Sequence, residues 1–159
     1  MFPSRKLYIK IIGDMKKILI SACLVGDKVR YDGHTNYTPL YKELLNEYEL
    51  VPFCPEVEGG LSIPRNPSEI QGDKVVSNKG KDVTNNFVEG AKKALLICQY
   101  LNIDTAILKD GSPSCGVYEI HDGSFTDKKI SGQGVTAKLL REHGITVYSE
   151  SEIEKLLKK

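Results

Sequence analysis

The chain lacks any hydrophobic run long enough to cross a membrane, and its charges almost cancel. Its 22 basic and 21 acidic residues leave a net charge of +1 at pH 7. A balanced charge gives the chain no overall attraction to nucleic acid or to a membrane surface. Spanning a bilayer takes about 20 consecutive apolar residues, and no segment approaches that length. We therefore expect no membrane partner and no binding to intact nucleic acid.

The first 14 residues lack the features of an export signal. They are basic, but their apolar part is short and interrupted, and no small-residue cleavage site follows. We interpret residues 1–14 as an extension before a single domain of residues 15–159, with Met15 as a candidate natural start. Without an export signal we expect a cytoplasmic protein. In that reducing compartment the four cysteines are free, metal-bound or catalytic rather than disulfide-bonded.

The chain also lacks internal repeats and low-complexity linkers, and what it has instead is an alternation of strands and helices. Short, continuously apolar runs predict buried strands at 17–22, 50–53, 105–108 and 145–148. Apolar residues at helical spacing predict helices at 40–48, 84–102 and 137–143. A capping box of Ser151 and Glu154 predicts a final helix.

Two β-hairpins are predicted between these elements. The first covers residues 69–84 with its turn at 78–80, and the second covers residues 117–130 with its turn at 122–123. Strands that alternate with helices favour a parallel sheet covered on both faces. The sequence therefore predicts an α/β domain, a three-layer Rossmann-like fold with a mostly parallel sheet and two inserted β-hairpins.

Three of the four cysteines come after predicted strands. Cys23 and Cys54 follow their strands directly, and Cys115 follows its strand after a turn of six residues. Ligands of parallel sheets bind at the carboxyl ends of the strands, so we expect these three thiols at one edge. Buried, inert thiols are the alternative. Cys98 lies on the apolar face of a predicted helix, and we expect it to be a core residue.

Three converging thiolates suit two kinds of metal centre. Zinc takes four ligands in a structural site, or three and a water in a catalytic one, and His34, His121 or His143 would complete the set. No histidine stands close in sequence to the three cysteines, however. A [4Fe-4S] cluster normally takes four cysteines, and with three it keeps one open iron that can act as a Lewis acid toward a sulfur ligand.

Polar residues beside the cysteines are candidates for catalysis and substrate binding. Glu56 lies two residues after Cys54, where a carboxylate could act as a general acid or base unless it is simply an exposed loop residue. Ser112 and Ser114 flank Pro113, and we expect one of them to close the turn and the other to position a substrate. Three charged residues on loops at the same edge either bind polar groups of the substrate or hold the loops in ion pairs: Arg30, Asp32 and Arg65.

Several motifs resemble, in the same order, the thiouracil desulfidase family. They are ISACLVG at 20–26, VRYDG at 29–33, CPE at 54–56 with GGL at 59–61 and PR at 64–65, LK at 108–109 and SPSCG at 112–116. The resemblance covers residues 16–148. It implies an oxygen-sensitive [4Fe-4S] cluster held by Cys23, Cys54 and Cys115, with an open iron that takes the sulfur of a thiocarbonyl. It also implies that the family's catalytic residues correspond to Glu56 and Ser112.

On this resemblance we predict a C–S bond hydrolase that converts a thiolated nucleobase, such as 2-thiouracil, to the oxygenated base and hydrosulfide. Glu56 would shuttle protons and Ser112 would position the base. The residues expected to bind substrate are Arg30, Asp32, Arg65 and Ser114. The expected partner is a small thiolated base or nucleoside, and a homodimer is compatible with the sequence. Two other hypotheses are a sulfide carrier that uses the open iron and a non-catalytic module stabilised by zinc.

Overall fold

A four-stranded parallel sheet forms the centre of the computed structural model, which describes residues 15–158. Strands β1 (Lys16–Ser21), β2 (Tyr48–Phe53), β5 (Thr105–Leu108) and β8 (Thr146–Ser149) lie in the order β2-β1-β5-β8. All three pairs of neighbouring strands are parallel. All four residues of β5 and the last four of β1 are buried. This explains their continuous apolar sequences, because a strand covered on both faces has no solvent side.

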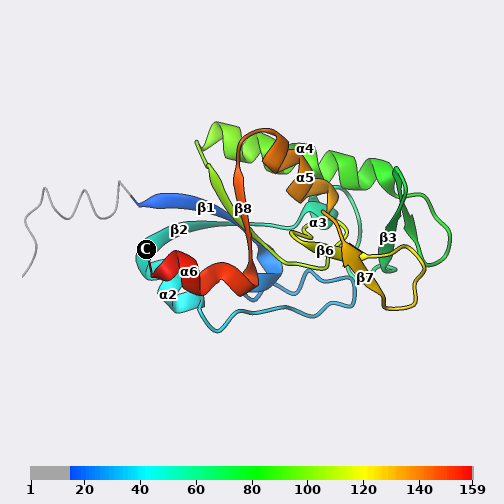
Figure 1. Cartoon of the computed structure of the whole chain (residues 1–159), viewed down its shortest axis with the longest axis horizontal. Helices are drawn as coiled ribbons and strands as arrows, with labels where there is room; N and C mark the ends of the chain where they lie inside the picture. Colours follow the sequence, from blue (N-terminus) through cyan, green and yellow to red (C-terminus); the bar gives the residue numbers. More distant parts are fainter. Residues whose placement is uncertain (1–14, 159) are drawn as a thin grey trace, which may run out of the picture.

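Helices cover both faces of this sheet, as Figure 1 shows. The helices α4 (Thr84–Tyr100) and α5 (Val135–Glu142) lie on one face, and α2 (Tyr41–Glu47) and α6 (Ile153–Leu157) lie on the other. Successive residues of β1 point to opposite faces. Leu19 accordingly packs in the core under α4 and α5, whereas Ile18 and Ile20 pack in the core toward α2 and α6. The predicted three-layer α/β architecture is confirmed.

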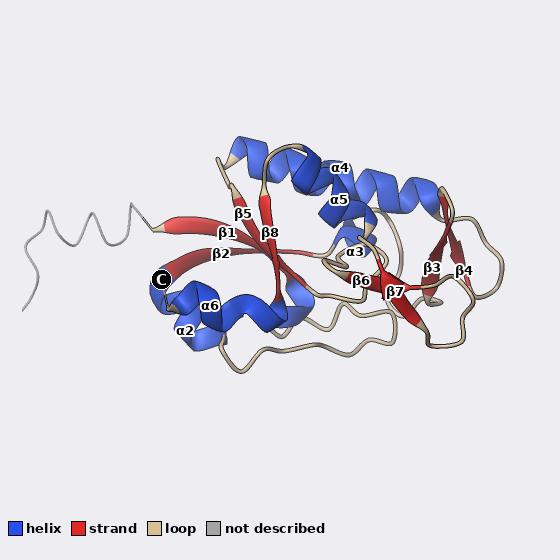
Figure 2. Cartoon of the chain, in the orientation of Figure 1, coloured by secondary structure: helices blue, strands red, loops and turns tan. Residues whose placement is uncertain are grey.

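Two antiparallel hairpins are inserted into this framework and lie together at one end of the molecule (Figure 2). They are β3 (Ser68–Gln71) with β4 (Lys74–Ser77), and β6 (Glu119–His121) with β7 (Lys129–Ser131). The buried carboxylate of Glu69 joins them, since its Oε1 accepts hydrogen bonds from the N–H groups of Gly123 (2.9 Å) and Phe125 (3.2 Å).

Several predicted boundaries were wrong. The first hairpin turns at Gly72 and Asp73, and the segment 78–80 forms a second turn after β4. The C-terminal capping box uses Ser149 and Glu152, two residues earlier than predicted, and starts the 3-10 helix η2 (Glu150–Glu152) before α6. The remaining strands and helices begin or end within about two residues of their predicted limits. Two short elements were not predicted, the 3-10 helix η1 (Ala22–Val25) and the helix α3 (Pro55–Glu58).

The strand order creates a crevice at the carboxyl ends of the strands. The chain passes from β1 to β2 on one side, and from β2 it crosses to β5 on the other side of β1. Loops that leave β1 and β5 therefore diverge, which is the place where open α/β sheets bind ligands. No helix within residues 15–158 is long and apolar enough to cross a membrane. The predicted N-terminal extension, residues 1–14, lies outside the described residues.

Candidate active site

A cavity of about 300 Å³ lies at this crevice, and Cys23, Cys54 and Cys115 all line it. Cys23 lies in η1 directly after β1, and Cys54 lies between β2 and α3, where Pro55 begins the helix. Cys115 lies in the loop after β5, and its backbone N–H donates to Ser112 Oγ at 3.1 Å. The topology thus brings together three thiols from three different strand ends.

Cys115 is buried, Cys23 and Cys54 are half-buried, and the three thiols are close enough to influence one another. Burial raises the pKa of each of them above its ordinary value, and the neighbouring cysteines raise the pKa of Cys23 and of Cys115 further. Buried neutral thiols are poor nucleophiles, whereas a metal ion would favour their thiolate forms. Cys98 is different, because it is buried in α4 away from the cavity and burial alone raises its pKa to about 11. Its predicted place in the core is confirmed.

The three sulfurs do not form a site for a single metal ion. Across residues 15–158, no group of three or more His, Cys, Asp or Glu side chains is placed to hold one. A cluster of several iron atoms is larger than one ion, so its cysteine ligands stand farther apart than the ligands of a single metal ion. The spacing of the donors therefore suits a cluster better than it suits zinc.

Glu56 enters the same cavity from α3 and is held from two directions. Its Oε1 accepts a hydrogen bond from Arg65 Nε at 3.2 Å, and its Oε2 accepts one from Ser114 Oγ at 2.8 Å. The Arg65 side chain is 7% exposed and also donates to the carbonyl of Val29 at 2.8 Å. Arg65 was predicted to bind substrate or to form an ion pair, and the structure shows the ion pair.

The two serines connect the Cys115 loop to Glu56. Ser114 Oγ lies 2.9 Å from Ser112 Oγ, and Ser114 is 1% exposed. Because the Ser114 proton goes to the carboxylate, its oxygen is left to accept the proton of Ser112. Ser112 Oγ also accepts the N–H groups of Ser114 and Cys115, both at 3.1 Å, which closes the turn. A continuous chain of hydrogen bonds therefore runs from Ser112 through Ser114 to Glu56.

Residues 18–152 match the protein family described as 2-thiouracil desulfurase. The chain belongs to this family. The match spans both inserted hairpins and all three cavity cysteines, so the site described above lies entirely within the family domain.

Several relatives are similar to this chain over most of its length. The solved structure of the [4Fe-4S]-dependent thiouracil desulfidase TudS is 46% identical, with a TM-score of 0.85 over 89% of this chain and 95% of that chain. YbbK of Bacillus subtilis (strain 168) is 42% identical over 150 residues, 88% of this chain and 99% of that protein. The leucine–tRNA ligase of Borrelia hermsii (strain HS1 / DAH) is 31% identical over 103 residues, 64% of this chain but 12% of the ligase.

Of the two remaining predicted substrate-binding residues, Arg30 lines the cavity and Asp32 contacts Arg30 from the same loop. The Arg30 guanidinium contacts Asp32 Oδ2 at 3.1 Å and Asn36 Oδ1 at 2.9 Å. Asp32 is exposed and is not among the residues that line the cavity. Its carboxylate instead accepts the His34 N–H at 3.0 Å, so its contacts hold the loop together.

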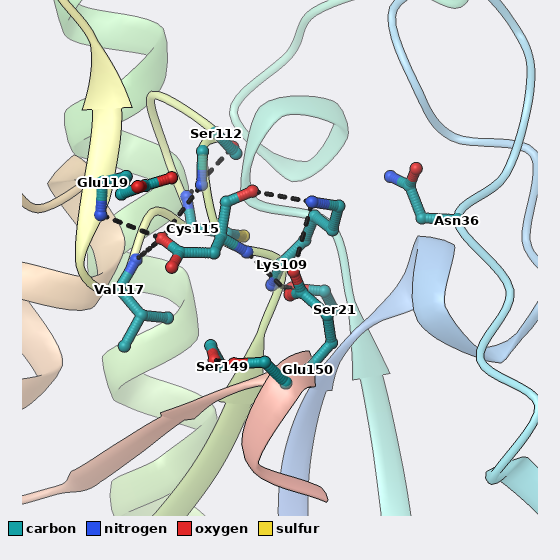
Figure 3. Close-up of polar contacts among 12 residues, drawn as sticks. Ser21, Asn36, Lys109, Ser112, Cys115, Val117, Glu119, Ser149 and Glu150 are labelled. Carbon is teal, nitrogen blue, oxygen red and sulfur yellow. Dashed lines mark hydrogen bonds and ion pairs between the residues drawn. The ribbon is translucent and has the colours of Figure 1, made fainter. Parts of the chain in front are cut away.

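Sequence analysis missed several cavity residues that the family domain brings together. Lys109, directly after β5, donates from Nζ to Glu150 Oε1 at 3.2 Å and to the Asp110 carbonyl at 2.8 Å (Figure 3). Its backbone N–H donates to Ser21 Oγ at 2.9 Å. The position of Lys109 directly after a predicted strand was a clue in the sequence, because the three cysteines were identified by their positions after predicted strands. Asn36 had no such clue, because it lies far from any strand end.

Proposed function

We propose that this chain removes sulfur from a thiolated nucleobase such as 2-thiouracil and gives the oxygenated base and hydrosulfide. The observation that supports this most directly is the cavity itself, in which three thiols and a hydrogen-bonded carboxylate meet within a thiouracil desulfurase domain. The reaction exchanges the C=S bond for a C=O bond with one water, so it needs no oxidant or reductant.

The residues present fit a [4Fe-4S] cluster held by Cys23, Cys54 and Cys115. The donor set is purely thiol and comes from three segments, and Asn36 Nδ2 donates to the sulfur of Cys23 at 3.4 Å. With only three protein ligands, such a cluster supplies an iron with an open position, a Lewis acid that prefers the sulfur of the base. The cluster-dependent relative TudS is consistent with this assignment.

Glu56 is proposed as the general base and acid of the reaction. Its Oε2 faces the serines of the Cys115 loop, where a carboxylate can take a proton from the attacking water and return one to the departing sulfur. Arg65 keeps the carboxylate in one orientation through the ion pair at Oε1. A residue that transfers protons has to keep the same position throughout the reaction. The buried Arg65 side chain has little freedom to move, so it holds the Glu56 carboxylate in place.

Ser112 is proposed to position the base, and Ser114 to connect it to Glu56. Ser112 lines the cavity and is half-buried, so its hydroxyl can meet a bound base, whereas Ser114 is enclosed. A cavity of about 300 Å³ is at the lower end of the range for ligand sites and is suited to a small ring. The assignments of Arg30, Asp32, Arg65 and Ser114 to substrate binding, the single domain from Met15, the cytoplasmic location and the homodimer stay predictions.

Metal and sulfide analysis of protein purified without oxygen tests this proposal. We expect about four irons and about four acid-labile sulfides per chain, and conversion of 2-thiouracil to uracil with release of hydrosulfide. Cys23→Ala, Cys54→Ala and Cys115→Ala should each lose the cluster and the activity. Cys98→Ala is the matched control, because its thiol is buried away from the cavity, and it should keep both. Zinc alone, or no metal after reconstitution with iron and sulfide, would overturn the cluster assignment.

A further inference from the structure

The loop of residues 30–36 is a compact structure that packs against Cys23. The N–H of Arg30 donates to the His34 carbonyl at 3.2 Å, and the N–H of Gly33 donates to the Arg30 carbonyl at 3.0 Å. Gly33 has a φ of 79°, a left-handed conformation that suits glycine. These bonds close the loop on itself, so that the residue at its end, Asn36, has a fixed position.

Asn36 contacts Cys23 at two points. Its backbone N–H donates to the Cys23 carbonyl at 3.0 Å, and its side-chain Nδ2 donates to Cys23 Sγ at 3.4 Å. The Thr35 hydroxyl donates to the same carbonyl at 2.6 Å. Figure 3 shows Asn36 beside the end of β1, with its amide extended from the loop. The loop therefore holds both the backbone and the sulfur of this cysteine.

Arg30 decides which way the Asn36 amide points. A guanidinium has donors and no acceptor, so only the amide oxygen can face it. Arg30 Nη1 donates to Asn36 Oδ1 at 2.9 Å, which leaves the NH₂ group to face the sulfur. Asp32 holds Arg30 from the other side with an ion pair of 3.1 Å. An Asp32–Arg30–Asn36 chain thus ends in an N–H directed at Cys23.

The sulfurs of the other two cavity cysteines have donors of other kinds: the backbone N–H groups of Glu56 and Val57 at Cys54, and the Ser21 hydroxyl at Cys115. Cys54 Sγ lies 4.0 Å from the carbonyl of Val29, a group that can only accept, and Cys115 Sγ lies 3.7 Å from the Ser114 hydroxyl. An N–H donor withdraws charge from a thiolate, and a cation behind the amide strengthens this effect. Cys23 is therefore the cavity cysteine whose sulfur accepts an N–H from a side chain, and this bond can be removed by a substitution.

We propose that Asn36, oriented by Arg30 and Asp32, is a positioning residue that raises the reduction potential of the cluster. It also slows the loss of the iron that Cys23 binds. This inference rests on the proposed function, because it requires the cluster. Hydrogen bonds to cysteine sulfur are among the factors that set the potential of iron–sulfur centres. The inference gives Arg30 and Asp32 a role in tuning the metal centre through Asn36, in place of direct contact with the substrate.

The test compares the reconstituted holoenzyme with Asn36→Asp and Asn36→Leu. Asn36→Asp keeps an acceptor for Arg30 and removes the N–H, and Asn36→Leu removes the N–H without adding charge. Both should shift the midpoint potential to a more negative value, measured by EPR during a redox titration, and should lose iron to a chelator faster. Arg30→Leu should shift the potential in the same direction by a smaller amount, since the amide remains but loses its orientation.

Asn46→Asp on the exposed surface of α2 is the matched control, because it makes the same charge change away from the cavity. Its potential and iron loss should equal those of the wild type. Potential and chelator rate both unchanged in Asn36→Asp and Asn36→Leu would overturn the inference while leaving the proposed function intact. A wild-type chain that takes up no cluster would overturn the proposed function and this inference with it.

Discussion

Glu56 has few conformations open to it, because a cation holds one carboxylate oxygen and a hydroxyl holds the other. Its side chain is 16% exposed, so it remains accessible from the cavity while both oxygens are in place. Glu58, two residues later on the same short helix, is exposed and makes its contacts through its backbone, whose N–H donates to the Cys54 carbonyl and whose carbonyl accepts Lys93 Nζ. The two glutamates therefore offer a direct comparison.

Glu56→Gln should lower the turnover of 2-thiouracil by roughly 10²- to 10⁴-fold, since an amide accepts the Ser114 hydrogen bond but carries no proton in the reaction. Iron and sulfide content should stay close to those of the wild type, whereas the thermal unfolding midpoint should fall, because a neutral amide cannot replace the ion pair with the buried Arg65. Steady-state kinetics and metal analysis on the same preparation check this. Glu58→Gln should behave as wild type, and a Glu56→Gln variant with full turnover would remove Glu56 from the mechanism.

At the scale of the residue, sequence reasoning found those site residues that stand next to an informative neighbour. Glu56 was found because it follows Cys54, and Ser112 because it belongs to the Cys115 loop. The contact of Ser114 with Glu56 joins positions 58 residues apart, and Asn36 reaches Cys23 across 13 residues. Such contacts depend on how loops fold over the crevice, and no local pattern in the sequence encodes that.

At the scale of the element, α4 acts as the support of α3 and therefore of Cys54 and Glu56. Asn86 Nδ2 donates to the Gly59 carbonyl at 2.8 Å, and Lys93 Nζ donates to the Glu58 carbonyl at 2.8 Å. Between these two contacts the backbones meet at Gly90, where a Cβ atom would overlap the carbonyl oxygen of Pro55. The close approach of the α3 and α4 backbones thus explains why a glycine occurs in the middle of this long helix.

Gly90→Ala should destabilise the chain by about 1–3 kcal/mol, because the added methyl group forces α3 away from α4. In an exposed helix the same change would stabilise by about 1 kcal/mol, so the sign of the effect is informative. Urea unfolding followed by circular dichroism measures it. Glu89→Ala, one residue earlier on the exposed side of α4, should change the free energy of unfolding by less than about 0.5 kcal/mol. A stabilised Gly90→Ala variant would contradict the close packing.

Elements were predictable where one periodicity dominated, and less so where two local patterns competed. Gly72 and Gly80 both adopt positive φ, so two turns were available to the first hairpin. The pairing of Ile70 with Val75 decided for the earlier one. Likewise Ser149 and Ser151 each stand three residues before a glutamate, and the end of β8 selected Ser149. In both cases the local sequence allows two positions for the turn or the capping box, and tertiary packing determines which one forms.

At the scale of the whole molecule, stability depends on pH through carboxylates that accept backbone hydrogen bonds. Asp110 Oδ1 accepts the N–H groups of Gly111, Val117, Tyr118 and Glu119 at 2.8 to 3.0 Å. Burial alone would raise the pKa of Asp110, but these donors hold it below its ordinary value. Hydrogen bonds from neighbouring residues also lower the pKa of Asp82, Asp104 and Asp122.

The sign of the pH effect follows from the depressed pKa. A carboxylate with a lower pKa in the folded chain stabilises it above the unfolded pKa of about 3.9, and this contribution is lost as the pH falls through the folded value. The free energy of unfolding should therefore decrease between pH 5 and pH 3. Asp110→Asn should be destabilised at pH 6 and should approach the wild type as the pH falls. Urea unfolding at a series of pH values checks this.

Asp73→Asn, in the exposed turn of the first hairpin, is the control for this series and should follow the wild-type curve. A difference between Asp110→Asn and wild type that is independent of pH would show that the Asp110 charge is not what the four N–H groups require. The Cys115 loop would then depend on the shape of this side chain alone.

The architecture as a whole was the most predictable level, because alternation of apolar strands with amphipathic helices leaves few arrangements. The strand order β2-β1-β5-β8 follows from a reversal after β2, and the three cysteines meet because of that reversal. Their meeting was therefore foreseeable without any local motif. The exact spacing of the sulfurs was not, since η1 and α3, the short helices beside Cys23 and Cys54, have no distinctive sequence pattern.

The separation of the three cysteines along the chain has one more consequence. Cys23, Cys54 and Cys115 stand 31 and 61 residues apart, so a cluster held by all three would close two long loops at once. Cross-links over such lengths stabilise a folded chain by about 4 kcal/mol each in the chain-entropy model. The cofactor would then stabilise the tertiary structure as well as take part in the reaction. Destruction of the cluster by oxygen would lower the stability of the fold and abolish turnover together.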